Sequence, residues 1–336
     1  MPAPISLVER SPEVSAEQIV ASLAPPPQFD GATFESYRPD PAHPSQTEAL
    51  ERMRELVTAW TSPRRGGLFK KKAPEVKPGI YLDGGFGVGK THLLAALWKA
   101  MPGPKRFGTF IEYTALVGAL GYAETVRQLQ GSSIICIDEF ELDDPGDTMV
   151  MTRLLGELVA SGTKLAATSN TPPNALGEGR FAASDFLREI QAIADRFQIM
   201  RIDGDDYRQR DISGSAPTVE PDELEPALAG FEGTVALDDF DALVAHLAHV
   251  HPSRYVGLVR DVDALGLREV RVLHDQNDAL RFVALVDRLY DAQVAIRASG
   301  TTLSSVFSEE MLGGGYRKKY LRAISRLVAL ANERWS

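Results

Sequence analysis

Short apolar runs alternate with amphipathic segments between residues 44 and 202. Runs without polar interruption, typical of strands buried on both faces, predict strands at Ile80–Leu82, Gly108–Glu112, Ser133–Asp138, Lys164–Ser169 and Gln198–Ile202. Apolar residues at helical spacing predict helices at 44–60, Lys90–Ala100, Tyr113–Leu129, Asp147–Ser161 and Phe186–Phe197. Strands separated by helices indicate an α/β fold, with a parallel sheet flanked by helices.

A stretch rich in Asp, Glu, Pro and Gly at residues 209–233 is typical of a linker. Beyond it, the pattern predicts helices at Leu237–Ala248, Ala279–Ala292 and Tyr316–Trp335, and strands at Tyr255–Val259, Val270–Leu273 and Val294–Ala298. This C-terminal α/β segment is short for a separate core, so we expect it to dock on the first. The predicted plan is a flexible N-terminal extension (1–32), a core (33–208), an acidic linker (209–233) and the C-terminal segment (234–336).

The two halves share one faint internal echo. Leu154–Asn170 reads as helix, turn and strand and leads into Thr-Ser-Asn-Thr, and Ala284–Gly300 reads the same and leads into Ala-Ser-Gly-Thr. The second copy lacks the Asp-Glu pair found in the first half. Coincidence between two helix-strand units is the favoured interpretation.

Composition narrows the class of protein. The chain has 336 residues, 44% hydrophobic and 24% charged, with a net charge of −10, which disfavours nucleic acid as a partner because DNA binding needs a basic face. There is no apolar run of about 18 residues, so no membrane span is expected. The single cysteine, Cys136, lies in an apolar run and is interpreted as a buried hydrophobe. With no signal-like N-terminus, a cytoplasmic protein is expected.

The segment Gly84–Thr91 matches the phosphate-binding pattern G-x-x-x-x-G-K-[ST] between a predicted strand and a predicted helix. Glycines let backbone N–H groups curl around phosphates, and the helix N-terminus adds partial positive charge. We expect Lys90 to bridge the β- and γ-phosphates of ATP and Thr91 to coordinate Mg²⁺. The predicted ATP-binding residues are Gln46, Gly84, Gly85, Phe86, Gly87, Val88, Gly89, Lys90, Thr91 and His92.

Two adjacent carboxylates follow the buried strand Ile134–Ile137. Asp138 is predicted to hold the Mg²⁺ and Glu139 to polarise the attacking water, because two negative charges beside a phosphate site make sense with a metal and a hydrolytic role. The competing interpretation is a helix N-cap with carboxylates in the first turn. Together with the phosphate loop, the pair favours ATP hydrolysis.

Polar and basic residues after the next strands suggest further roles. Asn170 ends a buried strand where ATPases of the AAA+ class place a side chain that senses the γ-phosphate; the alternative is a turn residue before Pro172. Arg180, Arg188 and Arg196 are candidates for an arginine that reaches a neighbouring subunit's nucleotide, and Arg188 is the chosen one.

Seven segments in order resemble the AFG-type AAA+ ATPases, a family that includes bacterial cell-division proteins of the ZapE type and mitochondrial relatives. The resemblance spans about residues 34–330 and rests on Pro41–Gln46, Gly79–Thr91, Ile137–Asp144, Ala167–Pro173, Asp203–Arg208, Arg281–Tyr290 and Arg322–Leu327. Two segments depart from the family pattern: Gly108–Tyr113 replaces a strand rich in His and Phe, and extra residues separate Arg180-Phe181 from Phe186-Leu-Arg188.

The resemblance implies an ATP-driven machine that remodels or regulates protein partners. It implies a homo-oligomer that forms on ATP binding, an association with the division-ring protein FtsZ, and a Gln46 that approaches the adenine. Arg322 and Arg326 either contact the nucleotide or pair with nearby acids. The alternative class is a replication initiator or helicase loader, which Lys90-Thr-His-Leu-Leu-Ala-Ala also resembles. A third is a nucleotide-regulated scaffold without hydrolysis.

Overall fold

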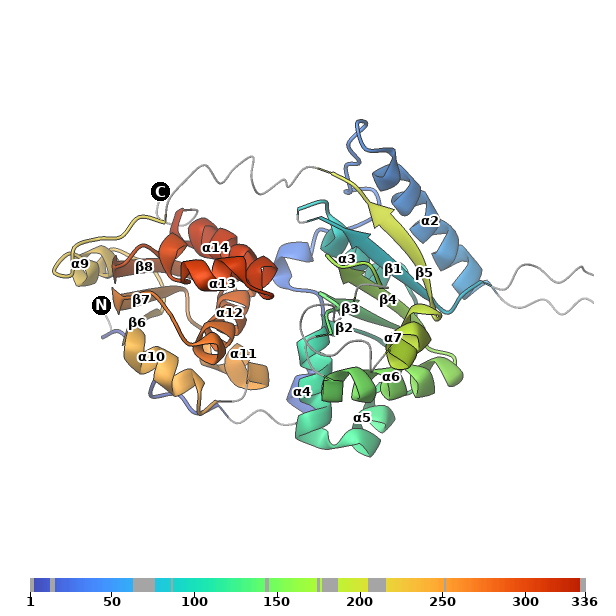
Figure 1. Ribbon diagram of the computed structural model, residues 1–336, viewed down its shortest axis with the longest axis horizontal. Coiled ribbons are helices and arrows are strands. Elements are labelled where there is room, and N and C mark those ends of the chain that lie inside the picture. The colour runs from blue at the N-terminus through green and yellow to red at the C-terminus, as the bar shows by residue number, and fades with distance from the viewer. Residues whose placement is uncertain are drawn as a thin grey trace, which may run out of the picture. The chain divides into compact units, whose positions relative to one another are not determined.

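Two compact units make up the computed structural model, which describes residues 3–12, 16–62, 76–85, 87–142, 145–173, 176, 187–204, 216–250 and 252–332 (Figure 1). The first unit is Ala16–Tyr207, and the second combines Met1–Ser15 with Arg208–Ser336. The chain therefore enters the second unit, leaves it to form the first, and returns. The boundaries expected from the sequence stay a prediction.

A five-stranded parallel sheet forms the centre of the first unit, in the order β2-β3-β4-β1-β5. Its strands are β1 (Gly79–Gly84), β2 (Lys105–Thr109), β3 (Ile134–Asp138), β4 (Lys164–Ser169) and β5 (Phe197–Ile202). Its helices are α1 (Ala16–Ala21), α2 (Pro44–Thr61), α3 (Lys90–Ala100), α4 (Phe110–Leu120), α5 (Tyr122–Leu129), α6 (Pro145–Ala160) and α7 (Leu187–Ala194). Figure 1 shows α2 and α3 on one side of the sheet and α4 to α7 on the other.

Burial explains why this sheet could be predicted. Every residue of β1 and β3 is buried, as expected for strands covered by helices on both faces. The predicted parallel α/β fold is confirmed. The strand expected at Gly108–Glu112 is wrong in position, because the Thr109 hydroxyl and the Glu112 carboxylate form a capping box that begins α4 at Phe110. The helix predicted at Tyr113–Leu129 is divided at Gly121, which adopts a φ of 73°.

The second unit has a three-stranded parallel sheet in the order β6-β7-β8. Its strands are β6 (Val235–Asp239), β7 (Ala264–Val270) and β8 (Ala295–Gly300). Its helices are α9 (Leu224–Ala229), α10 (Phe240–Leu247), α11 (Tyr255–Leu258), α12 (Gln276–Asp291), α13 (Glu309–Gly313) and α14 (Arg317–Asn332). A buried apolar cluster drawn from these elements gives the unit its own core, so the expectation that it lacks one is wrong.

Three predicted elements of the second unit differ from the structure. Tyr255–Val259 is helical rather than extended. The helix expected from Leu237 begins at Phe240, because β6 occupies the preceding residues and the Asp239 carboxylate caps α10 by accepting from the Ala242 N–H at 3.0 Å. The strand expected at Val270–Leu273 lies earlier in the chain, as β7, and overlaps the prediction only at Val270. Gly266 weakened the strand signal there. A Cβ on Gly266 would lie 2.3 Å from Leu228 Cδ1, so close packing requires the glycine.

The N-terminal segment packs into the second unit. Ile5 forms a parallel bridge with Ala236, and the Asp238 carboxylate accepts from the Leu7 N–H at 2.9 Å. Leu7 is fully buried. The sequence suggested a flexible extension here because the segment is rich in Pro and small residues. The partners that order Ile5 and Leu7 lie more than 200 residues away and leave no local signal.

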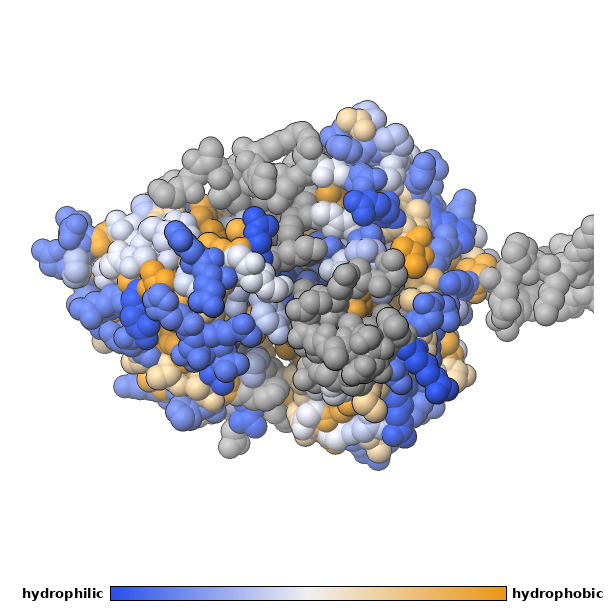
Figure 2. All heavy atoms as spheres, viewed as in Figure 1, coloured by the Kyte–Doolittle hydropathy of each residue, from blue (hydrophilic) through white to orange (hydrophobic). Residues whose placement is uncertain are grey.

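Apolar surface is scattered over the described residues. The large apolar side chains that are exposed there, Val76, Ile111, Met149 and Ile199, come from different elements, and Figure 2 shows small apolar groups between polar ones on the visible face. Among the described helices, none is both long and apolar enough to span a membrane.

Candidate active site

The turn between β1 and α3 has the backbone shape that a phosphate loop needs. Gly87 and Gly89 have φ values of 71° and 82°, in the left-handed region that glycine adopts without strain. A Cβ on Gly89 would lie 2.6 Å from Tyr37 Cε2, so packing also excludes a larger residue. The N-terminus of α3 begins directly after Gly89 and adds the partial positive charge that favours an anion. Phe86 lies outside the described residues.

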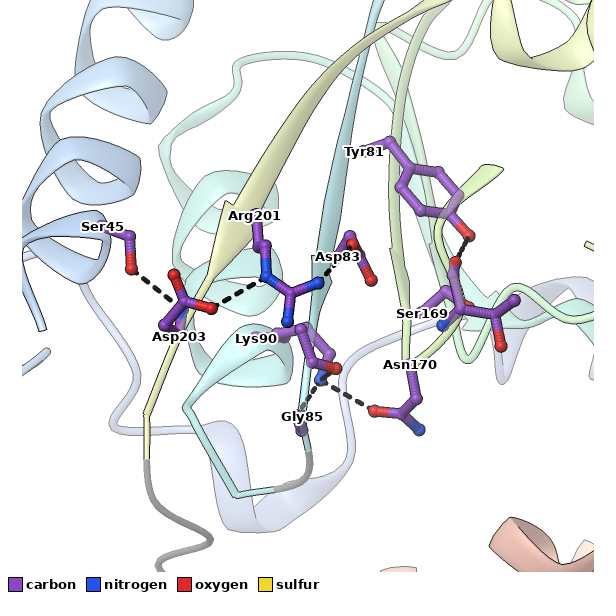
Figure 3. A network of polar contacts seen from close by, with 11 residues as sticks. Ser45, Tyr81, Asp83, Gly85, Lys90, Ser169, Asn170, Arg201 and Asp203 are labelled. Carbon is purple, nitrogen blue, oxygen red and sulfur yellow. Dashed lines mark hydrogen bonds and ion pairs between the residues drawn. The ribbon is translucent and has the colours of Figure 1, made fainter. Parts of the chain in front are cut away.

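Lys90 and Asn170 meet at this turn, although 80 residues separate them (Figure 3). The buried Lys90 ammonium donates to the Asn170 Oδ1 at 2.9 Å and to the Gly84 carbonyl at 2.9 Å, and it also donates to the Gly85 carbonyl. Because β4 lies next to β1 and parallel to it, the carboxyl end of β4 delivers Asn170 to the loop. The lysine and the polar strand end are therefore neighbours, as expected of two groups that contact one phosphate.

Asp138 lies at the carboxyl end of β3, between two threonine hydroxyls. Thr91 Oγ1 donates to Asp138 Oδ1 at 3.2 Å, and Thr168 Oγ1 donates to the same oxygen. Burial raises the pKa of Asp138, and the neighbouring Glu139 charge raises it further. Thr168 was missed by sequence reasoning, although the polar end of its strand was visible.

The oxygen donors of Thr91 and Asp138 fit Mg²⁺, a hard cation that prefers oxygen ligands. No cluster of three His, Cys, Asp or Glu side chains that could hold a metal ion is found in the described parts of the chain. A magnesium ion at such a site takes its other ligands from phosphate and water.

Glu139 has a φ of 52°, which is uncommon for a residue with a side chain. Its N–H donates to Thr168 Oγ1 at 3.1 Å, and the following Phe140 N–H donates to the Thr168 carbonyl at 2.7 Å. These bonds hold the turn after β3 in the strained conformation. Backbone strain of this kind clusters at active sites, because the surrounding structure must over-determine it.

Gln46 holds the start of α2 against the end of β5. Its Oε1 accepts from the Asp40 N–H at 2.9 Å, and its Nε2 donates to the Asp203 carbonyl at 2.9 Å. Ser45 Oγ accepts from the Asp203 N–H at 2.9 Å (Figure 3). A Cβ on Gly204 would lie 2.7 Å from the Gln46 amide and 3.0 Å from Val88, so this brace abuts the phosphate loop. The contact between Gln46 and adenine stays a prediction.

A second network missed from the sequence joins β5 to the strand that leads into the loop. Arg201 Nε donates to Asp203 Oδ1 at 2.8 Å, and Arg201 Nη1 lies 3.5 Å from the buried Asp83 carboxylate (Figure 3). Arg201 is largely exposed, so the pair contributes little stability. No signal in the sequence indicated this network, because Arg201 and Asp83 lie 118 residues apart.

His92 braces the segment that precedes α2. Its Nε2 lies 3.0 Å from both Ser36 Oγ and the Thr33 carbonyl, and its ring lies 5.6 Å from that of Tyr37. The Tyr37 hydroxyl in turn donates to the Val88 carbonyl at 3.1 Å. These contacts fix the outer side of the phosphate loop, and a direct contact of His92 with ATP stays a prediction.

Comparison with known proteins assigns the family. A family model described as AFG1-like ATPase matches residues 14–226 and 227–335. The chain belongs to the AFG1-like ATPase family. Membership implies ATP binding and ATPase activity, in agreement with the residues around the phosphate loop.

Relatives of this AFG1-like ATPase are found in bacteria and in animals. Cell division protein ZapE of Escherichia coli K12 is 28% identical over 94% of this chain and 97% of its own. Lactation elevated protein 1 homolog B of Danio rerio is 22% identical over 66% of this chain and 55% of its own. Among solved structures, domain III of the Thermotoga maritima replication initiation protein DnaA is similar, with 15% identity and a TM-score of 0.39. The match covers 80% of this chain and 87% of that one.

The arginine candidates of this AFG1-like ATPase fall into three groups. Arg180 lies outside the described residues. Arg196 lies just after α7 and donates to the Ala192 carbonyl of that helix. Arg188 is exposed in the first turn of α7, and its role across a subunit boundary stays a prediction.

The two arginines of α14 are explained within the second unit. Arg322 Nη2 donates to Asp287 Oδ2 at 2.9 Å, and Arg326 pairs with the other oxygen of the same carboxylate. Of the two possibilities that the sequence left open, pairing with a nearby acid is therefore the one found. The Asp-Tyr-Arg segment at 206–208 lies outside the described residues.

Proposed function

We propose that this AFG1-like ATPase hydrolyses ATP with Mg²⁺ and uses the turnover to remodel or regulate protein partners. The observation that carries the proposal is the convergence of Lys90, Thr91, Asp138 and Asn170 at one edge of the sheet. The lysine and the amide are suited to binding a triphosphate, and the hydroxyl and the carboxylate are suited to binding its metal ion.

Each side chain has a distinct role in the proposed reaction. The Lys90 ammonium binds the β- and γ-phosphates, and the Asn170 amide hydrogen-bonds the γ-phosphate and orients water. Thr91 and Asp138 hold Mg²⁺, which offsets the negative charge of the phosphates. Glu139 accepts a proton from the water that attacks the γ-phosphorus, while the bond to the bridging oxygen of ADP breaks.

Phosphate release measured with and without Mg²⁺ tests this assignment. We expect Lys90→Ala to abolish ATP binding. Glu139→Gln should bind ATP with wild-type affinity and lose turnover by at least about 100-fold, as is typical when a group acting on the transition state is removed. Turnover by Glu139→Gln at the wild-type rate would refute the role of Glu139. Turnover that persists in EDTA would refute the role of the metal.

The nature of the partner is proposed from the relative named as a cell division protein. We propose division proteins, with FtsZ as the first candidate, and a cytoplasmic homo-oligomer in which Arg188 reaches the neighbouring nucleotide. Co-sedimentation with FtsZ polymers in ATP should retain Glu139→Gln and not Lys90→Ala, which cannot load ATP. Equal sedimentation of both variants would contradict ATP-dependent binding.

The proposed action of Arg188 has its own test. Arg188→Ala should lower turnover while leaving ATP binding unchanged. Arg127→Ala is a matched control, because Arg127 is an exposed helical arginine that pairs with Glu124 one turn away. If both substitutions have the same effect on turnover, Arg188 does not act on the nucleotide.

A further inference from the structure

Unusual backbone conformations recur in the two units at a nearly constant spacing along the chain. Left-handed φ angles occur at Gly103, Gly131 and Glu139 in the first unit, and at Gly233, Asp261 and Glu269 in the second. Each pair is separated by 130 residues. A fourth pair, Gly162 and Gln293, follows α6 and α12 with a separation of 131. Residues with side chains rarely adopt this conformation, so the pair Glu139 and Glu269, in which both members have one, is the most specific of the four.

The hydrogen bonds at these turns also recur. The Glu139 N–H donates to the hydroxyl of Thr168 at 3.1 Å, and the Glu269 N–H donates to the hydroxyl of Ser299 at 3.1 Å. Glu139 directly follows β3, and Glu269 lies at the register shift near the end of β7. Both bond to the next strand along the sheet. Serine and threonine therefore perform the same backbone role in the two units.

The turn after the long helix repeats in the same way. The Thr163 N–H donates to the Leu158 carbonyl at 3.0 Å, and the Val294 N–H donates to the Leu289 carbonyl at 2.9 Å. The helices α6 and α12 have 16 residues each, and β4 and β8 have six. The faint echo in the sequence thus coincides with equal lengths and equal hydrogen bonds.

Strand register extends the match to the other edge of each sheet. Lys105 pairs with Ile134 between β2 and β3, and Val235 pairs with Ala264 between β6 and β7, again 130 residues on. The residue that ends β2 and the residue that ends β6 both cap the following helix with a side-chain oxygen. An N-terminal segment lies along each outer strand, through Phe107 N–H to Leu23 O at 3.0 Å and Leu237 N–H to Ile5 O at 2.9 Å.

A single parallel bridge in the second unit lies where β1 lies in the first unit. Val219 bridges Ser299 in parallel on the outer side of β8, where β1 in the first unit pairs Leu82 with Thr168 on β4. The chain then enters α9, which packs against β7 and β8 as α3 packs against β3 and β4. The order of the strands is therefore the same from β1 to β4 and from the Val219 bridge to β8, and β5 has no counterpart among the described residues of the second unit.

We infer that the second unit is a repeat of the ATPase fold in which an ion pair between Glu225 and Arg268 replaces the contact between Thr91 and Asp138 at the nucleotide site. Thr91, the second residue of α3, donates to Asp138; Glu225, the second residue of α9, pairs with Arg268 at 2.6 Å. Arg268 occupies the position of Asp138, one residue before the strained glutamate. A cation there repels Mg²⁺, and a carboxylate in place of Thr91 repels phosphate.

The connection that replaces the phosphate loop cannot bind phosphate either. Residues 83–89 join Leu82 to Lys90, whereas the four residues Glu220-Pro-Asp-Glu223 join Val219 to Leu224. Pro221 has no N–H to donate, three carboxylates replace glycines, and α9 has only six residues. The second repeat therefore takes no nucleotide, so the chain holds one ATP, and the second repeat is a structural partner that does not switch with nucleotide.

Titration of the full chain with a fluorescent ATP analogue and Mg²⁺ tests this inference, which rests in part on the proposed function. We expect one analogue per chain in the wild type and in Glu225→Ala and Arg268→Ala. Thr91→Ala and Asp138→Ala, the matched substitutions in the first repeat, should weaken binding by at least 10-fold. Because Glu225 and Arg268 are exposed, their substitution is not expected to prevent folding.

The outcomes separate the two proposals. Two bound analogues per chain would overturn the inference. So would binding that remains in Lys90→Ala and is lost in the double variant Lys90→Ala/Arg268→Ala. No binding by the wild type would refute the proposed function while agreeing with a second repeat that takes no nucleotide. Hydrogen exchange provides an independent readout: ATP should protect residues 84–91 and leave 219–230 unchanged, and protection of both segments would also overturn the inference.

Discussion

Substitution of Thr168 by valine removes one hydroxyl from the site and keeps the volume of the side chain. That hydroxyl donates to the buried Asp138 carboxylate and accepts from the Glu139 N–H at 3.1 Å. A hydrogen bond to a charged group contributes about 1.5–3 kcal/mol and a neutral one about 1 kcal/mol. We therefore expect Thr168→Val to lower the free energy of unfolding by about 2–4 kcal/mol, measured by urea denaturation.

The same substitution should impair turnover through Asp138 and Glu139. Without the Thr168 donor, the pKa of Asp138, already raised by burial, rises further, so less carboxylate is available for Mg²⁺. A loss of about 1.4–2.8 kcal/mol in that interaction corresponds to about 10- to 100-fold more Mg²⁺ for half-maximal phosphate release. Thr168→Ser retains the hydroxyl and should restore most of the activity.

The repeated fold offers a matched control. Ser299 accepts from the Glu269 N–H at 3.1 Å in the second repeat, so Ser299→Ala removes the equivalent backbone contact. It should lower the free energy of unfolding by about 1 kcal/mol without changing the Mg²⁺ dependence. Wild-type turnover and wild-type Mg²⁺ dependence in Thr168→Val would refute the reasoning.

Three further predictions concern stability, each measured by urea denaturation. Asp287→Ala removes the carboxylate that pairs with the buried Arg322 and the half-buried Arg326, and it should cost about 3–5 kcal/mol; a loss under 1 kcal/mol would contradict this. Although burial opposes it, the two guanidinium groups hold the pKa of Asp287 below its ordinary value, so its contribution exists above about pH 4 and is lost as pH falls below that. Glu269→Gly should stabilise by about 0.5–1 kcal/mol, because glycine adopts the φ of 54° without strain, whereas Glu269→Ala should not. Gln46→Leu should lower the free energy of unfolding by about 2 kcal/mol, since two backbone groups lose their partner. An unchanged free energy of unfolding would show that these two bonds do not stabilise the fold.

Local signals were sufficient for the parts of the fold that depend on sequence neighbours. The helix at Lys90–Ala100 and the strand at Lys164–Ser169 were predicted with the bounds that the structure has, because an amphipathic helix leaves a helical period in the sequence and a buried strand leaves a continuous apolar run. The strand expected at Tyr255–Val259 failed because a short apolar run fits a buried helix equally well.

Contacts across the sheet could not be predicted residue by residue. The strand pairing that places Asn170 beside Lys90 follows from a parallel sheet in the order β3-β4-β1, which the sequence does not state. Thr168 was visible only as part of a polar strand end, and Arg201 gave no signal, because Asp138 and Asp83 lie on neighbouring strands. The second unit's core was missed for the same reason, since Leu7 joins it from the far end of the chain.

By itself, the sequence identified the candidate nucleotide-binding residues: a phosphate loop and an acidic strand end need particular residues at a fixed spacing, and Gly84–Thr91 and Asp138-Glu139 match that pattern. The tertiary structure alone decided which distant residues complete the site and that the fold occurs twice. The repeat is hidden in the sequence because a backbone turn can be satisfied by different side chains, Gly131 in one unit and Asp261 in the other. Backbone geometry is maintained by packing and hydrogen bonds, while the charges that bind a nucleotide can be exchanged without disturbing it.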